Sequence, residues 1–137
     1  DDAYFKLPSP KSTGTDYFNQ SWILEFFQKE MSNLDFLATV TELTAQSIAR
    51  EINAINSEHE KVIVYGGGSN NTFLINRIRE NLKNYDVVSS ELIGLDPDYV
   101  EAIAFAWLAK ERIKNKTIDL TQITGSRSIA LLGECYL

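Results

Sequence analysis

Cysteine, histidine and methionine are scarce in this chain, each occurring once among 137 residues. A single cysteine, Cys135, excludes an internal disulfide bond, which favours a reducing compartment. A single histidine leaves too few ligands for a histidine- and cysteine-based metal cluster. Apolar runs are also short, and none approaches the roughly 20 residues that a membrane-spanning helix needs. We therefore expect neither a metal cluster nor a membrane partner.

Positive charge is also limited: 13 lysines and arginines stand against 19 acidic residues, which gives a formal net charge of −6. Without a dense basic patch, we expect no nucleic-acid partner. The length suffices for one domain with a hydrophobic core, and 44% hydrophobic residues are typical of globular proteins. Prolines and turn formers predict an extended or looped segment over residues 1–20, so the domain covers residues 21–137.

Hydrophobic periodicity predicts four helices, over residues 21–30, 34–56 and 71–83 and from Asp96-Pro97 to residue 115. Short β-branched runs predict strands at 62–65, 85–89 and 129–132. This alternation indicates an α/β fold with a mainly parallel sheet flanked by helices. The apolar side chains that we expect to be buried on the three longer helices are Leu37, Val40, Thr44, Ile48, Ile52 and Ile55, then Leu74, Ile78 and Leu82, then Val100, Ile103, Ala104, Trp107 and Leu108.

The glycine run Gly66-Gly67-Gly68 follows the first predicted strand and precedes a helix. A backbone without Cβ atoms lets a ligand come close, and helix N-terminal N–H groups favour a phosphate or a nucleotide sugar. The run does not match GxGxxG, and Ser89-Ser90 stands where a dinucleotide site needs an acidic residue. A tight turn without a ligand is the alternative. Asn71 can cap the next helix, bind a ligand hydroxyl, or do both.

Two carboxylates on predicted helices are candidates for ligand contact. Glu101 lies beyond the first turn that Asp96-Pro97 would begin, so helix capping does not explain it. It is either a residue at the rim of an apolar face or a ligand contact. Glu42 poses the same question on the long helix, among three threonines.

Three further features have simpler explanations. The end of a phosphate loop is similar to Lys11-Ser12-Thr13-Gly14. However, Pro10 stands where that motif requires glycine, and no strand precedes the segment. We expect a solvated loop there, although its lysine and hydroxyls could contact an anion. His59, between two glutamates, fits a solvated loop better than a catalyst. Cys135 fits a small apolar core residue.

Taken together, five segments in order resemble the C-terminal part of the anhydro-N-acetylmuramic acid kinase family. They are Pro10-Lys11-Ser12-Thr13-Gly14, Tyr17-Phe18-Asn19, the run from Ala38 to Ala45, Gly66-Gly67-Gly68-Ser69-Asn70-Asn71 and the run from Glu101 to Ala109. Thr124-Gly125-Ser126-Arg127 and Leu132-Gly133 also fit the ending of that family. The similarity extends over nearly the whole chain.

The resemblance implies an incomplete three-layer, ribonuclease-H-like domain of the superfamily that contains sugar kinases, chaperone ATPases and actin. It implies ATP- and Mg²⁺-dependent phosphorylation of 1,6-anhydro-N-acetylmuramic acid, with water opening the anhydro bridge, during cell-wall sugar recycling in the bacterial cytoplasm. By the same resemblance, Gly66, Gly67, Gly68 and Asn71 bind the nucleotide. Glu101 corresponds to a glutamate that contacts the sugar.

One departure from the family limits these implications. The family's N-terminal part carries an Asp-Thr-Gly-Pro-Gly-Asn motif, whose aspartate activates water, and this sequence contains no such motif. We therefore expect no catalytic base in this chain, no activity from it alone, and ATP and Mg²⁺ held mainly by the absent part. A truncated sheet predicts binding to the missing half or self-association as a dimer. The alternative is a non-catalytic assembly or regulatory module with a structural glycine turn.

Overall fold

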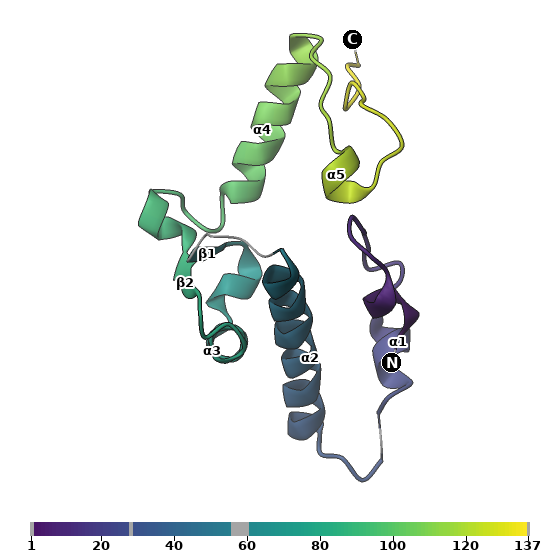
Figure 1. Cartoon of the computed structure of the whole chain (residues 1–137), viewed down its shortest axis with the longest axis vertical. Helices are drawn as coiled ribbons and strands as arrows, with labels where there is room; N and C mark the ends of the chain where they lie inside the picture. Colours follow the sequence, from purple (N-terminus) through teal and green to yellow (C-terminus); the bar gives the residue numbers. More distant parts are fainter. Residues whose placement is uncertain (1, 28, 56–60, 137) are drawn as a thin grey trace. The chain divides into compact units, whose positions relative to one another are not determined.

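The computed structural model describes residues 2–27, 29–55 and 61–136, and Figure 1 traces them. Backbone packing divides the chain into two compact units, unit 1 (Asp1–Trp22 with Ala102–Leu137) and unit 2 (Ile23–Glu101). In chain order the elements are η1 (Ala3–Lys6), α1 (Gln20–Leu24), α2 (Asn33–Ala54), β1 (Lys61–Val64), η2 (Gly67–Asn70), α3 (Thr72–Asn81), β2 (Asp86–Ser89), η3 (Ser90–Ile93), α4 (Val100–Ile113) and α5 (Thr121–Thr124).

Unit 2 contains a two-stranded parallel sheet, in which Lys61 of β1 lies opposite Asp86 of β2 and Val64 opposite Ser89. Parallel strands need a crossover connection, and α3 supplies it. Both strands therefore end at the same edge of the sheet, where η2 follows β1 and η3 follows β2. The predicted α/β class with a parallel sheet is confirmed. The three-layer ribonuclease-H-like arrangement stays a prediction.

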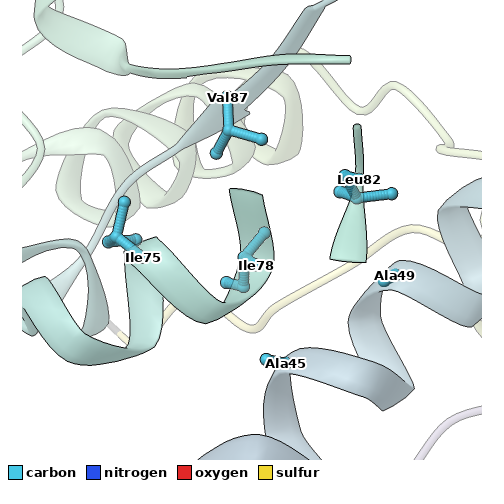
Figure 2. Packing of buried hydrophobic residues seen from close by; sticks show 6 residues of the cluster. All are labelled: Ala45, Ala49, Ile75, Ile78, Leu82 and Val87. Atoms are coloured by element: carbon cyan, nitrogen blue, oxygen red, sulfur yellow. The ribbon is translucent and has the colours of Figure 1, made fainter. Parts of the chain in front are cut away.

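The described core of unit 2 lies where α2, α3 and β2 meet (Figure 2). Its buried apolar residues are Ala45, Ala49, Ile75, Ile78, Leu82 and Val87. The predicted burial of Ile78 on α3 and of Leu82, directly after it, is confirmed, and Leu74 packs against the cluster while partly exposed. The large buried side chains come from α3, from its C-cap Leu82 and from β2, and they supply most of the hydrophobic stabilisation of this cluster.

The predicted buried stripe of α2 is mostly wrong. Leu37 is 61% exposed and Ile55 70% exposed, whereas Ala45 and Ala49 face the core and Ile52 packs against it. Large side chains dominate a periodicity count, so the pattern selected the wrong face. Short alanine side chains let the backbone of α2 approach α3 closely, and this sets the buried face.

Three helix starts can be compared with the predictions. The side chains of Ser32 and Asn71 accept hydrogen bonds from backbone N–H groups of α2 and α3, as N-caps do. By contrast, α4 begins at Val100 and not at Asp96-Pro97. The Asp96 carboxylate accepts from Asp98 N at 2.9 Å, and this local turn displaces the helix start. Glu101 therefore lies in the first turn of α4.

Unit 1 contains an aromatic cluster around one carboxylate. The Phe18 ring contacts Tyr4 and Trp22 edge to face, with centroids 5.1 and 4.7 Å apart. The Asp2 carboxylate accepts from Tyr4 N, Trp22 Nε1 and the Tyr17 hydroxyl, and these bonds lower the pKa of Asp2. These contacts join the turn-rich segment 1–20 to Trp22 of α1 and form a small packed centre. The proposed division at residue 20 stays a prediction.

Several predictions for local structure are corrected. The helix expected over residues 21–30 ends at Leu24, because the N–H groups of Phe26 and Phe27 donate three residues back, as in turns. The last strand is reduced to one antiparallel bridge between Ile118 and Ala130. The helix from Val100 has no buried residue. Cys135 is exposed and is not a core residue.

None of the described helices combines the length and the apolar character that crossing a bilayer requires.

Candidate functional site

The glycine turn joins β1 to α3 at the edge where both strands end. Gly66 has φ 76° and ψ 178°, a conformation almost restricted to glycine. Its carbonyl accepts from Ser69 N at 2.9 Å and from Ser69 Oγ at 2.7 Å. Its N–H donates to Pro97 O at 2.9 Å. These three bonds fix the turn and attach it to the loop before α4.

The three glycines differ in what a side chain would meet. Gly66 needs its freedom because of its positive φ. At Gly67 φ is ordinary, and an added Cβ would meet no described atom within 4 Å. At Gly68 it would touch Leu74 Cδ2 at 3.8 Å, an ordinary contact. The backbone conformation therefore explains why glycine is needed at position 66. It does not explain why positions 67 and 68 also lack a side chain.

The glycine turn also presents backbone N–H donors. The first N–H groups of a helical turn have no partner within that turn, and in η2 these belong to Gly67 and Gly68. A ligand can therefore approach Gly67 without meeting a described side chain, whereas beside Gly68 it would meet Leu74. Anions and hydroxyl oxygens suit such donors.

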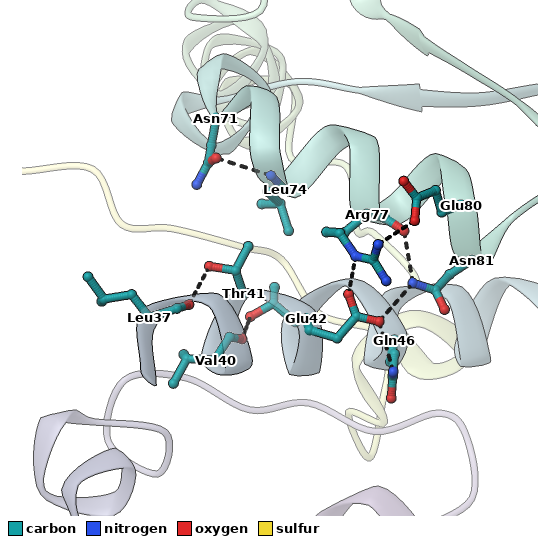
Figure 3. A network of polar contacts seen from close by, with 11 residues as sticks. Leu37, Val40, Thr41, Glu42, Gln46, Asn71, Leu74, Arg77, Glu80 and Asn81 are labelled. Atoms are coloured by element: carbon teal, nitrogen blue, oxygen red, sulfur yellow. Dashed lines mark hydrogen bonds and ion pairs between the residues drawn. The ribbon is translucent and has the colours of Figure 1, made fainter. Parts of the chain in front are cut away.

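Asn71 caps α3. Its Oδ1 accepts from Leu74 N at 3.1 Å, and its carbonyl accepts from Ile75 N at 3.0 Å. Figure 3 shows the amide nitrogen directed away from Leu74. The capping role is confirmed. The amide nitrogen keeps two donors for the second role, ligand binding, which stays a prediction.

Glu101 is exposed in the first turn of α4, four residues after Pro97. The helix dipole favours a carboxylate in the first turn, and this alone can explain an acidic residue at position 101. The sequence prediction had excluded such a local explanation, because it placed Glu101 beyond the first turn. The Pro97–Gly66 hydrogen bond ties the loop before α4 to the glycine turn. Both sites belong to unit 2, which ends at Glu101.

The remaining candidates lie elsewhere. Lys11 Nζ donates to Leu7 O at 3.2 Å and lies 5.2 Å from the centre of the Tyr4 ring. Lys11 is thus engaged within unit 1, in a loop, as predicted. His59 lies outside the described residues. Over the described ranges, no group of three or more histidine, cysteine or acidic side chains could hold a metal ion.

Glu42 belongs to a polar network between α2 and α3 (Figure 3). Its carboxylate accepts from Arg77 Nε at 2.5 Å, Gln46 Nε2 at 2.8 Å and Asn81 Nδ2 at 3.2 Å. Arg77 also pairs with Glu80. These hydrogen bonds, that of Arg77 foremost, lower the pKa of Glu42 to about 2. We call Glu42, Arg77 and Asn81 the α2–α3 clamp.

A groove of about 590 Å³ lies beside the clamp. Its lining residues are Asp35, Ala38, Thr39, Glu42, Leu43, Gln46, Phe73 and Arg77. Most of its polar groups already have partners: Thr39 Oγ1 donates to Asp35 O, and the Asp35 carboxylate accepts from Ser32 Oγ. Glu42 therefore acts as an interhelical contact. Only its position was visible in the sequence, since its partners Arg77 and Asn81 lie more than thirty residues away.

Ser90, which the sequence offered only as evidence against a dinucleotide site, was not predicted as a candidate site residue. It is 1% exposed, and its hydroxyl has no hydrogen-bond partner among the described residues. It directly follows β2, at the edge where the glycine turn follows β1. Its place after a predicted strand was the one available indication.

This arrangement defines a class of protein: an α/β protein with a glycine turn at the carboxyl edge of parallel strands, where such folds bind their ligands. Over residues 1–137 the chain matches the family model of anhydro-N-acetylmuramic acid kinase. The chain therefore belongs to this family.

Curated relatives that carry the name anhydro-N-acetylmuramic acid kinase agree with this assignment. The chain is 41% identical over 143 residues to that of Actinobacillus pleuropneumoniae serotype 7, with 99% of this chain and 38% of the relative covered. It is 42% identical over 139 residues to that of Pasteurella multocida, covering 99% and 37%. For Coxiella burnetii (strain Dugway 5J108-111) the identity is 38% over 136 residues, covering 98% and 37%.

The chain thus spans less than two fifths of the length of these relatives. The predicted family, and the prediction that the chain matches only part of it, are confirmed. The matches do not bear out the predicted placement in the C-terminal part.

Proposed function

We propose that this chain is the nucleotide-binding part of an ATP-dependent anhydro-N-acetylmuramic acid kinase. The observation that supports nucleotide binding most directly is the open space beside Gly67. A turn that served packing alone would need glycine at Gly66, where φ is positive, and would tolerate a side chain at the next position. Close approach of a ligand to the backbone accounts for the remaining bare positions.

In this proposal Gly66, Gly67 and Gly68 form the floor under the nucleotide, and Asn71 donates from its amide nitrogen while its oxygen caps α3. Glu101 contacts the sugar. Its assignment depends on the family resemblance, and its exposure and its link to the turn through Pro97 are compatible with it.

The proposed reaction converts the anhydro sugar, ATP and water into the sugar 6-phosphate and ADP. A carboxylate takes a proton from water as the water attacks the anomeric carbon. The oxygen released from the anhydro bridge then takes the γ-phosphoryl group, while backbone donors offset the charge on the phosphates. Mg²⁺ bound with ATP would supply further positive charge there. This chain contributes the backbone donors of η2. The water-activating carboxylate must come from the rest of the kinase, because the sequence has no Asp-Thr-Gly-Pro-Gly-Asn motif.

The energetics of the site explain why the isolated chain should be inactive. A helix N-terminus stabilises an exposed anion by about 0.3–1 kcal/mol. Micromolar affinity requires about 8 kcal/mol. The donors described here therefore supply a small part of a working site, and ATP and Mg²⁺ must be held mainly by the rest of the kinase. We expect the complete enzyme to work in the bacterial cytoplasm, with the ribonuclease-H-like domain completed by further strands.

The test uses a chimera, in which this chain replaces the matched segment of the Pasteurella multocida kinase. MgATP is titrated calorimetrically into the chain alone and into the chimera, and phosphorylation of the anhydro sugar is followed with both. We expect binding and phosphorylation in the chimera and neither in the chain alone. A folded chimera that binds no MgATP would refute the proposal and favour the non-catalytic module. Phosphorylation by the chain alone would refute its predicted inactivity.

A further inference from the structure

Helix α4 has an unusual composition. From Val100 to Ala109 every residue except Glu101 is apolar, and the charged residues begin at Lys110. A helix that is apolar on all sides is normally buried in the core of a larger structure. We call the apolar residues from Val100 to Ala109, without Glu101, the α4 apolar surface.

The α4 apolar surface is largely bare in this chain. Ile103 is 49% exposed, Phe105 69% and Trp107 50%, and no residue of α4 is buried. Because successive residues of an α-helix turn by about 100°, Phe105 lies nearly opposite Ile103 and Trp107. Large apolar side chains therefore face solvent on two opposite sides of the helix. Monomeric proteins rarely leave large apolar side chains exposed together in this way.

We propose that the rest of the full-length kinase polypeptide packs around the α4 apolar surface. The chain spans about 38% of the relatives that it matches, so such a kinase has a further three fifths of polypeptide to cover the helix. A second copy of this chain is the less suitable occupant. A two-fold contact would cover one side of α4 and leave the opposite side bare.

This inference does not rest on nucleotide binding. It depends on the family, the lengths of the relatives and the exposure of α4, and not on the glycine turn. A chimera that fails to bind MgATP can still bury α4, and the reverse also holds. The two proposals can therefore fail separately.

Thiol labelling measures the burial directly. Single cysteines replace Phe105 and Trp107 in a Cys135→Ser background, because Cys135 is itself exposed. Lys114→Cys, an exposed position just beyond α4, is the matched control. In the chain alone we expect all three positions to react with a maleimide at similar rates. In the chimera Phe105→Cys and Trp107→Cys should react at least about tenfold more slowly, because reactivity follows exposure, while Lys114→Cys stays unchanged.

Equal rates at Phe105→Cys in the chain and in the folded chimera would overturn the proposal. Protection in the chain alone, together with a dimer in sedimentation, would assign the surface to a second copy and also overturn it. Hydrogen exchange of residues 100–113 in the unsubstituted chain and chimera needs no variant, so it decides the question if a cysteine variant fails to fold. Slower exchange in the chimera supports the proposal, and equal exchange contradicts it.

Discussion

Two neighbouring glycines offer the sharpest test of what folding alone requires at the turn. Gly66→Ala places a Cβ where φ is 76° and ψ is 178°, with no described atom within 4 Å of it. Any loss of stability must then come from backbone strain and not from a clash. Gly67→Ala adds the same methyl group one residue later, also into open space but at an ordinary φ.

The expected magnitudes differ clearly. A non-glycine residue held in such a conformation costs about 1–3 kcal/mol. For a chain of this size this corresponds to a fall in melting temperature of about 4–12 °C. Gly67→Ala should change the free energy of unfolding by no more than about 0.5 kcal/mol, as a surface substitution does.

Thermal unfolding of the 137-residue chain, followed by circular dichroism, measures both values. Ser69→Ala is not a suitable control, because the Ser69 hydroxyl bonds to the Gly66 carbonyl. If Gly67→Ala destabilised the chain as much as Gly66→Ala, the bareness of Gly67 would be structural, and support for a ligand there would disappear. If Gly66→Ala left stability unchanged, the conformational account of the turn would be wrong.

Two further predictions concern Glu42 and Asn71. The pKa of Glu42 is lowered from 4.5 to about 2 in the folded chain, so its contribution to stability is complete above pH 4.5 and is lost as the pH falls toward 2. The melting temperature should therefore fall more over this range in the wild type than in Glu42→Gln; parallel curves would contradict the α2–α3 clamp. Asn71→Ala removes the helix cap and should cost about 0.5–2 kcal/mol of stability. Asn71→Asp keeps the capping oxygen but replaces the amide N–H donors with negative charge. Its melting temperature should hold while MgATP affinity of the chimera falls; unchanged affinity would limit Asn71 to capping.

Local signals in the sequence were sufficient to predict the strand, turn and helix start around the glycine run. The β-branched run at 62–65, the glycines and Asn71 each act within a few residues, so β1, the turn and the start of α3 could be predicted. The start of α4 could not, because Asp96 has two local options, a helix cap and a turn through Asp98, and the second prevails.

Contacts between residues far apart in the sequence could not be predicted from motifs and periodicity. The α2–α3 clamp joins residues 35 apart in sequence, and the buried face of α2 consists of small alanines that carry little periodic signal. For Glu101 the family resemblance predicted a role, whereas its place in the first turn depends on where α4 begins. The exposure of α4 is likewise invisible to periodicity, which indicates an apolar helix but not what covers it.

The central claim is that a nucleotide lies against the bare backbone at Gly67. The most direct test is calorimetric titration of MgATP into the chimera and its Gly67→Ala variant, with the melting temperature of both measured in parallel. The account predicts that Gly67→Ala weakens MgATP binding by at least about tenfold, equivalent to about 1.4 kcal/mol, without a change in melting temperature. Equal affinity in the two folded chimeras would contradict it.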